Sequence, residues 1–211
     1  MNYQEFKDYL ITHLWKQGDS VVIDALDTLI KTANVEVDRV IDVPDRESRI
    51  TIDANTNPFT LPDDVKRVRA LSGTGSLNRE NGEMTYVTPG EFANKEAGRG
   101  PFPRNAYFTT VNNEVHVTYN IDPNVPVSFN LWYIKKIPDF KTTDESWVAE
   151  DFFDVYLYCV LKHSAPFLRE DERLAVWDNL YQTAVGTMVS EGEDRRYAGS
   201  ALKTQFSRNI R

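Results

Sequence analysis

The sequence predicts an α+β fold, in which helices from both ends of the chain form a bundle and a small antiparallel β-domain is inserted between them. Two observations support this prediction. Apolar residues recur at helical spacing in residues 1–45 and again in residues 144–192. Over residues 46–143, apolar and polar residues alternate, and prolines and glycines interrupt the chain. Residues 193–211 are expected to form an extended basic C-terminal tail.

Two amphipathic helices are predicted at the start of the chain. The first covers residues 3–15, and Gly18 can end it. The second begins at Asp19 or Ser20, which can cap a helix, and ends before Pro44, because proline disfavours helix in the residue before it. The apolar residues at helical spacing are Tyr3, Phe6, Leu10 and Leu14 in the first helix, and Val22, Leu26, Leu29, Ala33, Val37 and Val40 in the second.

The middle of the chain is predicted to be β structure. Ile50 and Ile52 alternate with polar residues in the segment SRITIDA. The clearest hairpin is AYFTTVNNEVHVTY, in which Asn112 and Asn113 tolerate the positive φ angles of a tight turn. A further strand, PVSFNLWYIKKI, follows the hairpin. The segment TPGEFANKEAG, which precedes it, is expected to form a short helix or a turn.

The last part of the chain is predicted to contain two packed helices. Residues 152–161, FFDVYLYCVL, are apolar nearly all round, so this helix should be buried on most sides. Pro166 is expected to break it, and Glu170 or Asp171 to start the next helix. Apolar residues of that helix alternate at spacings of three and four, which is typical of a bundle seam. They are Leu174, Trp177, Tyr181, Ala184 and Met188.

Charge separates an acidic body from a basic tail. The chain has 24 Lys or Arg and 32 Asp or Glu, a net charge of −8. Residues 195–211 carry five basic residues and no acidic one, so the rest of the chain is near −13. Such a body would repel phosphate, which argues against a typical nucleic-acid-binding domain.

Cysteine content and hydropathy indicate where the protein is made. The single Cys159 cannot form an intrachain disulfide, which favours a reducing compartment. No stretch approaches the roughly 18 apolar residues of a membrane span, and the N-terminus lacks the basic start and apolar block of a secretion signal. A soluble protein made in the cytoplasm, with no membrane contact, is expected.

The histidines do not predict a metal site. His13, His116 and His163 lie in different predicted elements, and none has a second ligand at a metal-binding spacing. Cys159 and His163 are four residues apart and could face each other on one helix. A thiol in an apolar helix is, however, usually buried and inert.

The acidic clusters and the glycines have structural explanations as well. The pair Asp63–Asp64 follows a helix breaker, and residues 170–172 stand at an expected helix start, where acids complement the helix dipole. Gly73 and Gly75 lack the Lys-Ser/Thr pair of a phosphate-binding loop, so a turn is expected there. No cofactor and no enzymatic activity is predicted, and a nuclease or hydrolase that uses these acids is the least favoured alternative.

Several segments follow one another in an order found in a known family. After a helical start comes FTLPDDVKRVRAL, with a Leu-Pro-x-Asp entry into a strand, then YVTPGEFANK and AYFTTVNNEVHVTY. FNLWYIKKIPDF ends in an aliphatic-Pro step, and WVAEDFFDVYLYCVLKHSAPFLREDERLAVWDNLYQTAV forms a closing helix pair. Over roughly residues 1–190, this order resembles the head-to-tail adaptor family of short-tailed bacteriophages, also called tail tubular protein A.

The resemblance implies a structural virion protein of the neck or tail, made in the host cytoplasm. Such a protein is expected to form a homo-oligomeric ring, dodecameric in the family, that docks on the portal protein and connects it to tail nozzle or tail fibre proteins. DNA would pass through its channel during ejection without sequence-specific binding. The alternative is another neck or tail module, a stopper or a carbohydrate-binding component, which rests on the 12% of aromatic residues.

The C-terminal tail provides the candidate portal-binding residues. Leu202, Phe206 and Ile210 recur every four residues and would form one stripe of a short helix that folds on binding. The basic residues around this stripe suit an acidic groove. A frayed terminus with incidental charge and a DNA contact are the alternatives. The predicted portal-binding residues are Arg195, Arg196, Tyr197, Leu202, Lys203, Phe206, Arg208, Ile210 and Arg211.

Overall fold

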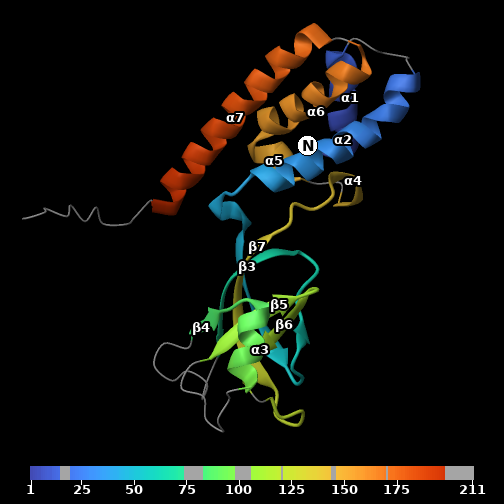
Figure 1. Ribbon diagram of the computed structural model, residues 1–211. Coiled ribbons are helices and arrows are strands. Elements are labelled where there is room, and N and C mark those ends of the chain that lie inside the picture. The colour runs from blue at the N-terminus through green and yellow to red at the C-terminus, as the bar shows by residue number, and fades with distance from the viewer. Residues whose placement is uncertain are drawn as a thin grey trace, which may run out of the picture. The chain divides into compact units, whose positions relative to one another are not determined.

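The protein consists of two compact units, each described here by itself. The computed structural model describes residues 1–14, 20–73, 83–97, 106–119, 121–143, 146–169 and 171–197. Met1–Asp45 and Asp139–Arg211 make up the first unit, which we call the helical unit, and Arg46–Pro138 make up the second, which we call the β unit (Figure 1).

The helical unit draws its helices from both ends of the chain. Helix α6 packs against both α2 and α7, so segments far apart in the sequence lie side by side (Figure 1). The described helices of this unit are α1 (Tyr3–His13), α2 (Ser20–Val40), α4 (Phe140–Thr143), α5 (Trp147–Asp151), α6 (Phe153–Phe167) and α7 (Asp171–Tyr197). A short 3-10 helix, Pro44–Arg46, leads directly into β1 (Glu47–Ala54).

Aromatic rings form much of the core of the helical unit. Phe6 from α1, Phe140 from α4 and Tyr156 from α6 are fully buried. The centroid of the Phe6 ring lies 5.7 Å from that of Phe140 and 5.3 Å from that of Tyr156. The Tyr156 hydroxyl donates a 3.0 Å hydrogen bond to Asn34 Oδ1 on α2, which satisfies both polar groups within the core. The core therefore joins the N-terminal helices to the C-terminal ones.

The β unit is built on one seven-stranded sheet with the strand order β1-β7-β3-β4-β5-β6-β2. It is nearly closed and barrel-like. Every neighbouring pair is antiparallel except β4 and β5, which are parallel and are connected through α3 (Pro89–Ala97). The strands are β1 (Glu47–Ala54), β2 (Phe59–Thr60), β3 (Val65–Gly73), β4 (Glu83–Tyr86), β5 (Tyr107–Val111), β6 (Glu114–Val117) and β7 (Val127–Lys135).

The sheet encloses its own apolar core. The rings of Phe59 and Phe129 stack with centroids 5.1 Å apart, and Leu71, Phe108 and Leu131 are buried beside them. Since buried side chains come from both ends of the strand order, the sheet must curve around this core. The β unit thus has the apolar interior of an independent domain.

The hairpin predicted from the sequence is confirmed. Strands β5 and β6 pair in an antiparallel manner on either side of Asn112 and Asn113. These two residues have φ angles of 51° and 71°. Both angles are positive, as a two-residue type I′ turn requires.

The predicted fold class is wrong. The structure is 55% helical and 26% strand, and its seven-stranded, nearly closed sheet is not a small antiparallel insertion into a helical bundle. The sequence pattern reveals strands with one solvated face and a local turn, as in the β5–β6 hairpin. The parallel β4–β5 pair requires a crossover through α3, and such pairing between distant segments leaves no local signal.

The predicted helix break at Pro166 is also wrong. Helix α6 continues to Phe167, and Pro166 lies in its last turn. A proline there removes only one of the final backbone hydrogen bonds, so the helix continues one residue further, to Phe167. Arg169, two residues beyond the helix, has a left-handed φ of 57°. Of the predicted seam, Tyr181, Ala184 and Met188 are buried, whereas Leu174 is 36% exposed.

Candidate functional site

The predicted portal-binding residues begin on a helix. Arg195, Arg196 and Tyr197 form the end of α7, which has a helical backbone up to Tyr197. The other predicted residues lie outside the described residues. They are Leu202, Lys203, Phe206, Arg208, Ile210 and Arg211.

The end of α7 is held against the helical unit. Arg195 Nη1 donates a 3.1 Å hydrogen bond to Asp45 Oδ2, and the guanidinium lies 5.5 Å from the centroid of the Phe152 ring. One turn earlier, Gly192 packs closely on Val43: a Cβ on Gly192 would lie 3.0 Å from Val43 Cγ1, so a larger residue there would require Val43 to shift. The end of α7 is therefore packed on the residues that precede the β unit.

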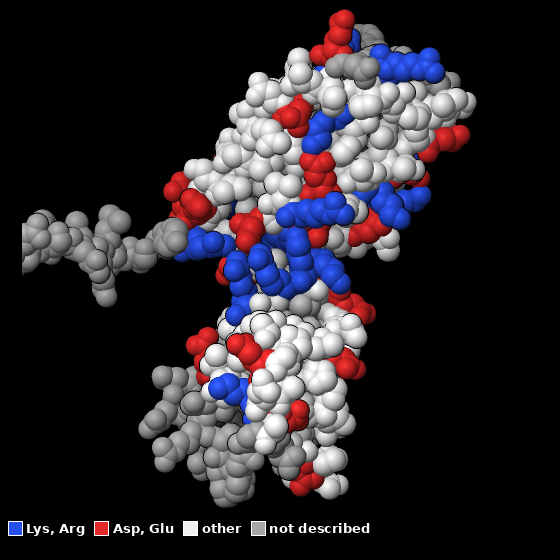
Figure 2. All heavy atoms as spheres, in the orientation of Figure 1, with Lys and Arg blue, Asp and Glu red and all other residues white. Residues whose placement is uncertain are grey.

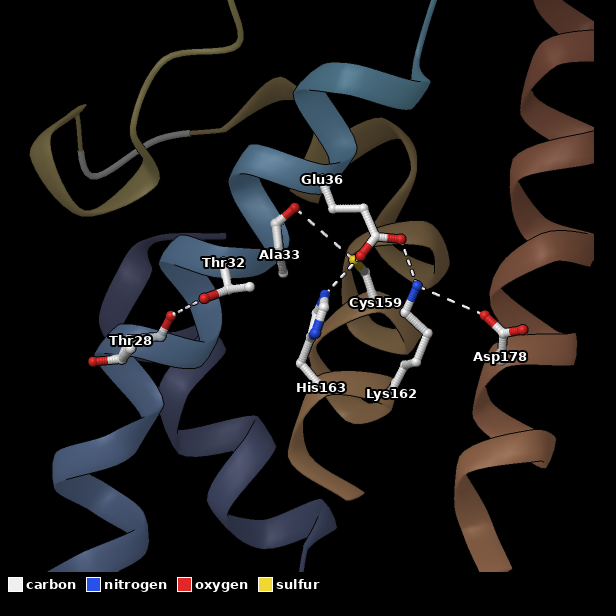
Figure 3. Close-up of polar contacts among 8 residues, drawn as sticks. All are labelled: Thr28, Thr32, Ala33, Glu36, Cys159, Lys162, His163 and Asp178. Atoms are coloured by element: carbon white, nitrogen blue, oxygen red, sulfur yellow. Dashed lines mark hydrogen bonds and ion pairs between the residues drawn. The ribbon is translucent and has the colours of Figure 1, made fainter. Parts of the chain in front are cut away.

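A polar cluster that the sequence did not reveal connects three helices (Figure 3). Glu36 on α2 accepts a hydrogen bond from Lys162 Nζ on α6. Its second carboxylate oxygen lies 2.7 Å from Nε2 of His163, also on α6. Lys162 Nζ is in addition 3.6 Å from Asp178 Oδ1 on α7. The cluster thus ties α6 to the helices on both sides of it.

Electrostatics at this cluster favour a charged Glu36 and a neutral Cys159. Burial opposes ionisation of Glu36, but hydrogen bonds from Lys162 and His163 outweigh it and hold the pKa of this carboxyl below its ordinary value. Burial raises the pKa of the Cys159 thiol to about 12. Cys159 Sγ contacts the Ala33 carbonyl oxygen at 3.9 Å and is protonated at neutral pH.

The same cluster has the residue types of a metal site. Ligand atoms of Glu36, Cys159 and His163 all lie within 4.8 Å of one another, so the structure does bring the Cys159–His163 pair together and adds a carboxylate. The Lys162 ammonium, however, binds the same carboxylate and would repel a cation. Because Lys162 already occupies this carboxylate, the arrangement favours an ion-pair network over a metal centre.

An open hollow along α2 shares Glu36 and His163 with the cluster. On one wall, Thr32 Oγ1 donates a 2.9 Å hydrogen bond to the Thr28 carbonyl oxygen (Figure 3). The residues around the hollow are Thr28, Lys31, Thr32, Val35, Glu36, Arg39 and His163.

The remaining candidate groups have separate structural surroundings. The His13 ring stacks on Tyr9 in the helical unit, whereas His116 lies beside Phe92 in the β unit. Asp64 accepts a 3.0 Å hydrogen bond from the Tyr133 hydroxyl, so it is engaged in fixing the entry to β3. Glu170 lies outside the described residues, as do residues 74–82 after Gly73.

Among the described helices, none combines the length and the apolar content needed to cross a membrane.

Comparison with protein families decides the class of this chain. The model of the SU10 adaptor protein family matches residues 1–205. The chain belongs to the SU10 adaptor protein family. A comparison with curated proteins gave no match.

Family membership confirms the broad class predicted from the order of segments. The protein is a structural phage adaptor, a virion component that interacts with other capsid or tail components. An adaptor has a structural role and the family name implies no reaction. The Glu36–Lys162–His163 cluster is accordingly a means of holding the adaptor's helices together.

Proposed function

We propose that this adaptor forms a homo-oligomeric ring, dodecameric as in the head-to-tail adaptors that its sequence resembles. The ring docks on the portal protein of a short-tailed phage and connects it to tail nozzle or tail fibre proteins. Packaged DNA passes through its channel without sequence-specific binding. Membership of the adaptor family over residues 1–205 is the observation that carries this proposal.

The C-terminal segment is the proposed portal-docking element. The last turns of α7 are held by the contacts of Arg195 and Gly192. Residues 198–211 carry three basic residues and no acidic one. Their apolar stripe of Leu202, Phe206 and Ile210 can dock into an apolar groove with acidic edges. Burial of one such side chain contributes about 1.5–3 kcal/mol.

The charge of the helical unit agrees with DNA passage. The unit contains 13 basic and 22 acidic residues, a net charge of −9. Such a surface repels the phosphates of DNA. Each contact between a phosphate and a Lys or Arg would add salt-sensitive affinity for DNA, and an acidic surface makes few such contacts. A surface of this kind lets DNA slide past.

Light scattering with the portal protein encoded beside this one tests the proposal. The full-length chain and a variant that ends after Tyr197 are each measured alone and mixed with the portal. This cut leaves α7 and the Arg195 contacts intact. We expect the full-length protein to form a ring on the portal and the shortened protein not to bind the portal. Two single variants form a matched pair: Phe206→Ala removes a residue of the apolar stripe and should weaken portal binding, whereas Thr204→Ala changes a residue outside the stripe and should not.

The outcomes are distinct. If the shortened chain binds as the full-length chain does, the docking segment is wrong and the adaptor function stands. If neither chain binds the portal, the proposed function is overturned.

A further inference from the structure

The β unit gathers its basic residues at one end of the sheet. Although the protein is acidic overall, Arg46–Pro138 carry 11 basic and 10 acidic residues, a net charge of +1. Figure 2 shows Lys and Arg side chains grouped over the ends of β3 and β7. By their positions in the strands, six of the eleven lie near the start of β1, along the start of β3 or at the end of β7 and are at least partly exposed, and we call these six the basic face. They are Arg49, Lys66, Arg67, Arg69, Lys135 and Lys136. Arg46, which precedes β1, is buried.

Strand pairing brings these residues together from three separate segments. β7 lies between β1 and β3. Arg49 on β1 is opposite Trp132 on β7, and Arg67 on β3 is opposite Ile134, two residues further along β7. Because neighbouring strands are about 4.8 Å apart, the start of β1, the end of β7 and the start of β3 form one continuous surface.

Two irregularities in β3 accommodate basic residues. The register with β7 shifts between Val65 and Arg67 and again between Val68 and Ala70, so each shift leaves one extra residue on β3. These extra residues are Lys66 and Arg69. Bulges re-aim side chains that would otherwise follow the alternation of the strand. β3 thus carries Lys66, Arg67 and Arg69 close together while Val65 and Leu71 remain in the core.

An exposed tryptophan lies among these charges. Trp132 is 36% exposed, although a large aromatic side chain is more often covered. The Arg49 guanidinium lies 4.9 Å from the centroid of its ring. An arginine stacked on an aromatic ring keeps its planar donors available for a phosphate, which is a common arrangement in nucleic-acid-binding surfaces.

The acids near the basic face are outnumbered. Glu47, Asp63 and Asp64 lie at the same strand ends, and Asp64 accepts the Tyr133 hydroxyl hydrogen bond. The face therefore has six basic against three acidic residues. Several of these residues make further contacts within the protein. The attraction of the face for a ligand is therefore argued from its summed charge and not from any single side chain. At physiological salt the screening length is about 8 Å, so a ligand on this face responds to the local charge and not to the net −8.

We propose that the basic face of the β unit binds the phosphate backbone of DNA. This inference rests on the proposed function only in that DNA passes through the adaptor. Binding here is independent of sequence, because Lys and Arg neutralise phosphates and release counterions without reading bases. The helical unit repels DNA, so the two units act on it in opposite ways.

Fluorescence anisotropy with a labelled duplex of mixed sequence tests this proposal on the full-length protein. We expect a Kd of roughly 10⁻⁶–10⁻⁴ M at physiological salt, which tightens as salt is lowered. The triple variant Arg49→Gln, Arg67→Gln and Arg69→Gln should bind at least tenfold more weakly. Each phosphate contact contributes about 0.9 to the slope of log Kd against log salt, so the slope should fall by about 2 to 3.

Two controls separate charge at this face from other effects. A triple variant of the helical unit, Lys31→Gln, Arg39→Gln and Arg173→Gln, makes the same change in net charge and should bind DNA as the unmodified protein does. The conservative variant Arg49→Lys, Arg67→Lys and Arg69→Lys should retain most binding, which excludes misfolding of the β unit as the cause of a loss.

Three results would overturn the proposal. In the first, the unmodified protein fails to bind DNA at 50 mM salt. In the second, both Gln variants lose the same amount of DNA affinity. In the third, this face binds polyglutamate more tightly than it binds DNA. The last result would assign the face to an acidic protein. Portal binding by the same variants, followed by light scattering, reports on the proposed function separately: failure there with DNA binding intact affects the ring proposal alone.

Discussion

The helical unit and the β unit both enclose apolar cores, but they place charge in different ways. In the helical unit, acids are bound by cations from other helices, so charge connects elements within the fold. In the β unit, basic side chains gather at one end of a sheet, and two bulges accommodate them there. The net charge of −8 is the sum of −9 and +1, so an argument from net charge describes only the helical unit.

Asp27 shows how the helical unit uses charge. It accepts hydrogen bonds from Lys141 Nζ at 2.5 Å, from Lys7 Nζ at 2.6 Å and from the Tyr3 hydroxyl at 3.0 Å. These bonds join α2 to α1 and α4. The hydrogen bonds from Lys141 and then Lys7 hold the pKa of Asp27 well below its ordinary value.

The largest expected effects come from breaking each core in turn. Phe129→Ala in the β unit and Phe6→Ala in the helical unit each remove a fully buried ring, which should cost about 3–5 kcal/mol of unfolding free energy. Hydrogen exchange should show lost protection in the unit that carries the substitution and little change in the other. Loss of protection in both units from either variant would contradict the comparison, because it would mean that the two cores are one cooperative unit.

The Glu36 cluster should be the next most sensitive feature. Glu36→Gln leaves Lys162 and His163 without their partly buried carboxylate, so we expect urea unfolding to show a loss of about 2–3 kcal/mol. Asp178→Asn is the matched control. Its side chain is 48% exposed and 3.6 Å from Lys162, so its effect should stay below about 1 kcal/mol. Equal effects would show that Glu36 is not the centre of the cluster.

Asp27→Asn tests the pH dependence of the helical unit. We expect a loss of about 1–2 kcal/mol at pH 7, a modest value because a third of the side chain is exposed. The pKa of Asp27 is lowered in the folded state, so its contribution is present above about pH 4, the ordinary value, and is lost as pH falls further. Unfolding curves of the variant and the unmodified protein should therefore converge in acid, and a constant difference down to pH 2 would contradict this assignment.

The smallest losses of stability are expected from removing one helix cap in each unit. Asn2 and Glu5 form a reciprocal capping box at α1, and Thr88 and Glu91 form one at α3. Asn2→Ala and Thr88→Ala should each cost about 0.5–1 kcal/mol. The loss should be larger for Asn2, because α1 buries three residues in its core whereas α3 buries only Phe92. Thermal unfolding of the two variants under identical conditions measures the difference.

Local patterns predicted much of the secondary structure but not how distant segments meet. The Asn112–Asn113 turn was predictable because both residues act on their own backbone. Glu36 was missed as the partner of His163 because 127 positions separate them. The basic face was hidden for two reasons: a strongly acidic chain suggested that no phosphate site exists, and the bulges that accommodate Lys66 and Arg69 depend on pairing with β7.

Cys159 gives the adaptor a practical property. It is the single cysteine of the chain, fully buried, and its thiol is protonated at neutral pH. A maleimide dye reacts with exposed thiolates, so it should leave the folded protein unlabelled. One cysteine introduced at Thr51, on the β unit, or at Ser207, in the C-terminal segment, would then carry the only fluorophore. Time-resolved fluorescence could follow DNA contact and portal docking separately during assembly, without first removing a native cysteine.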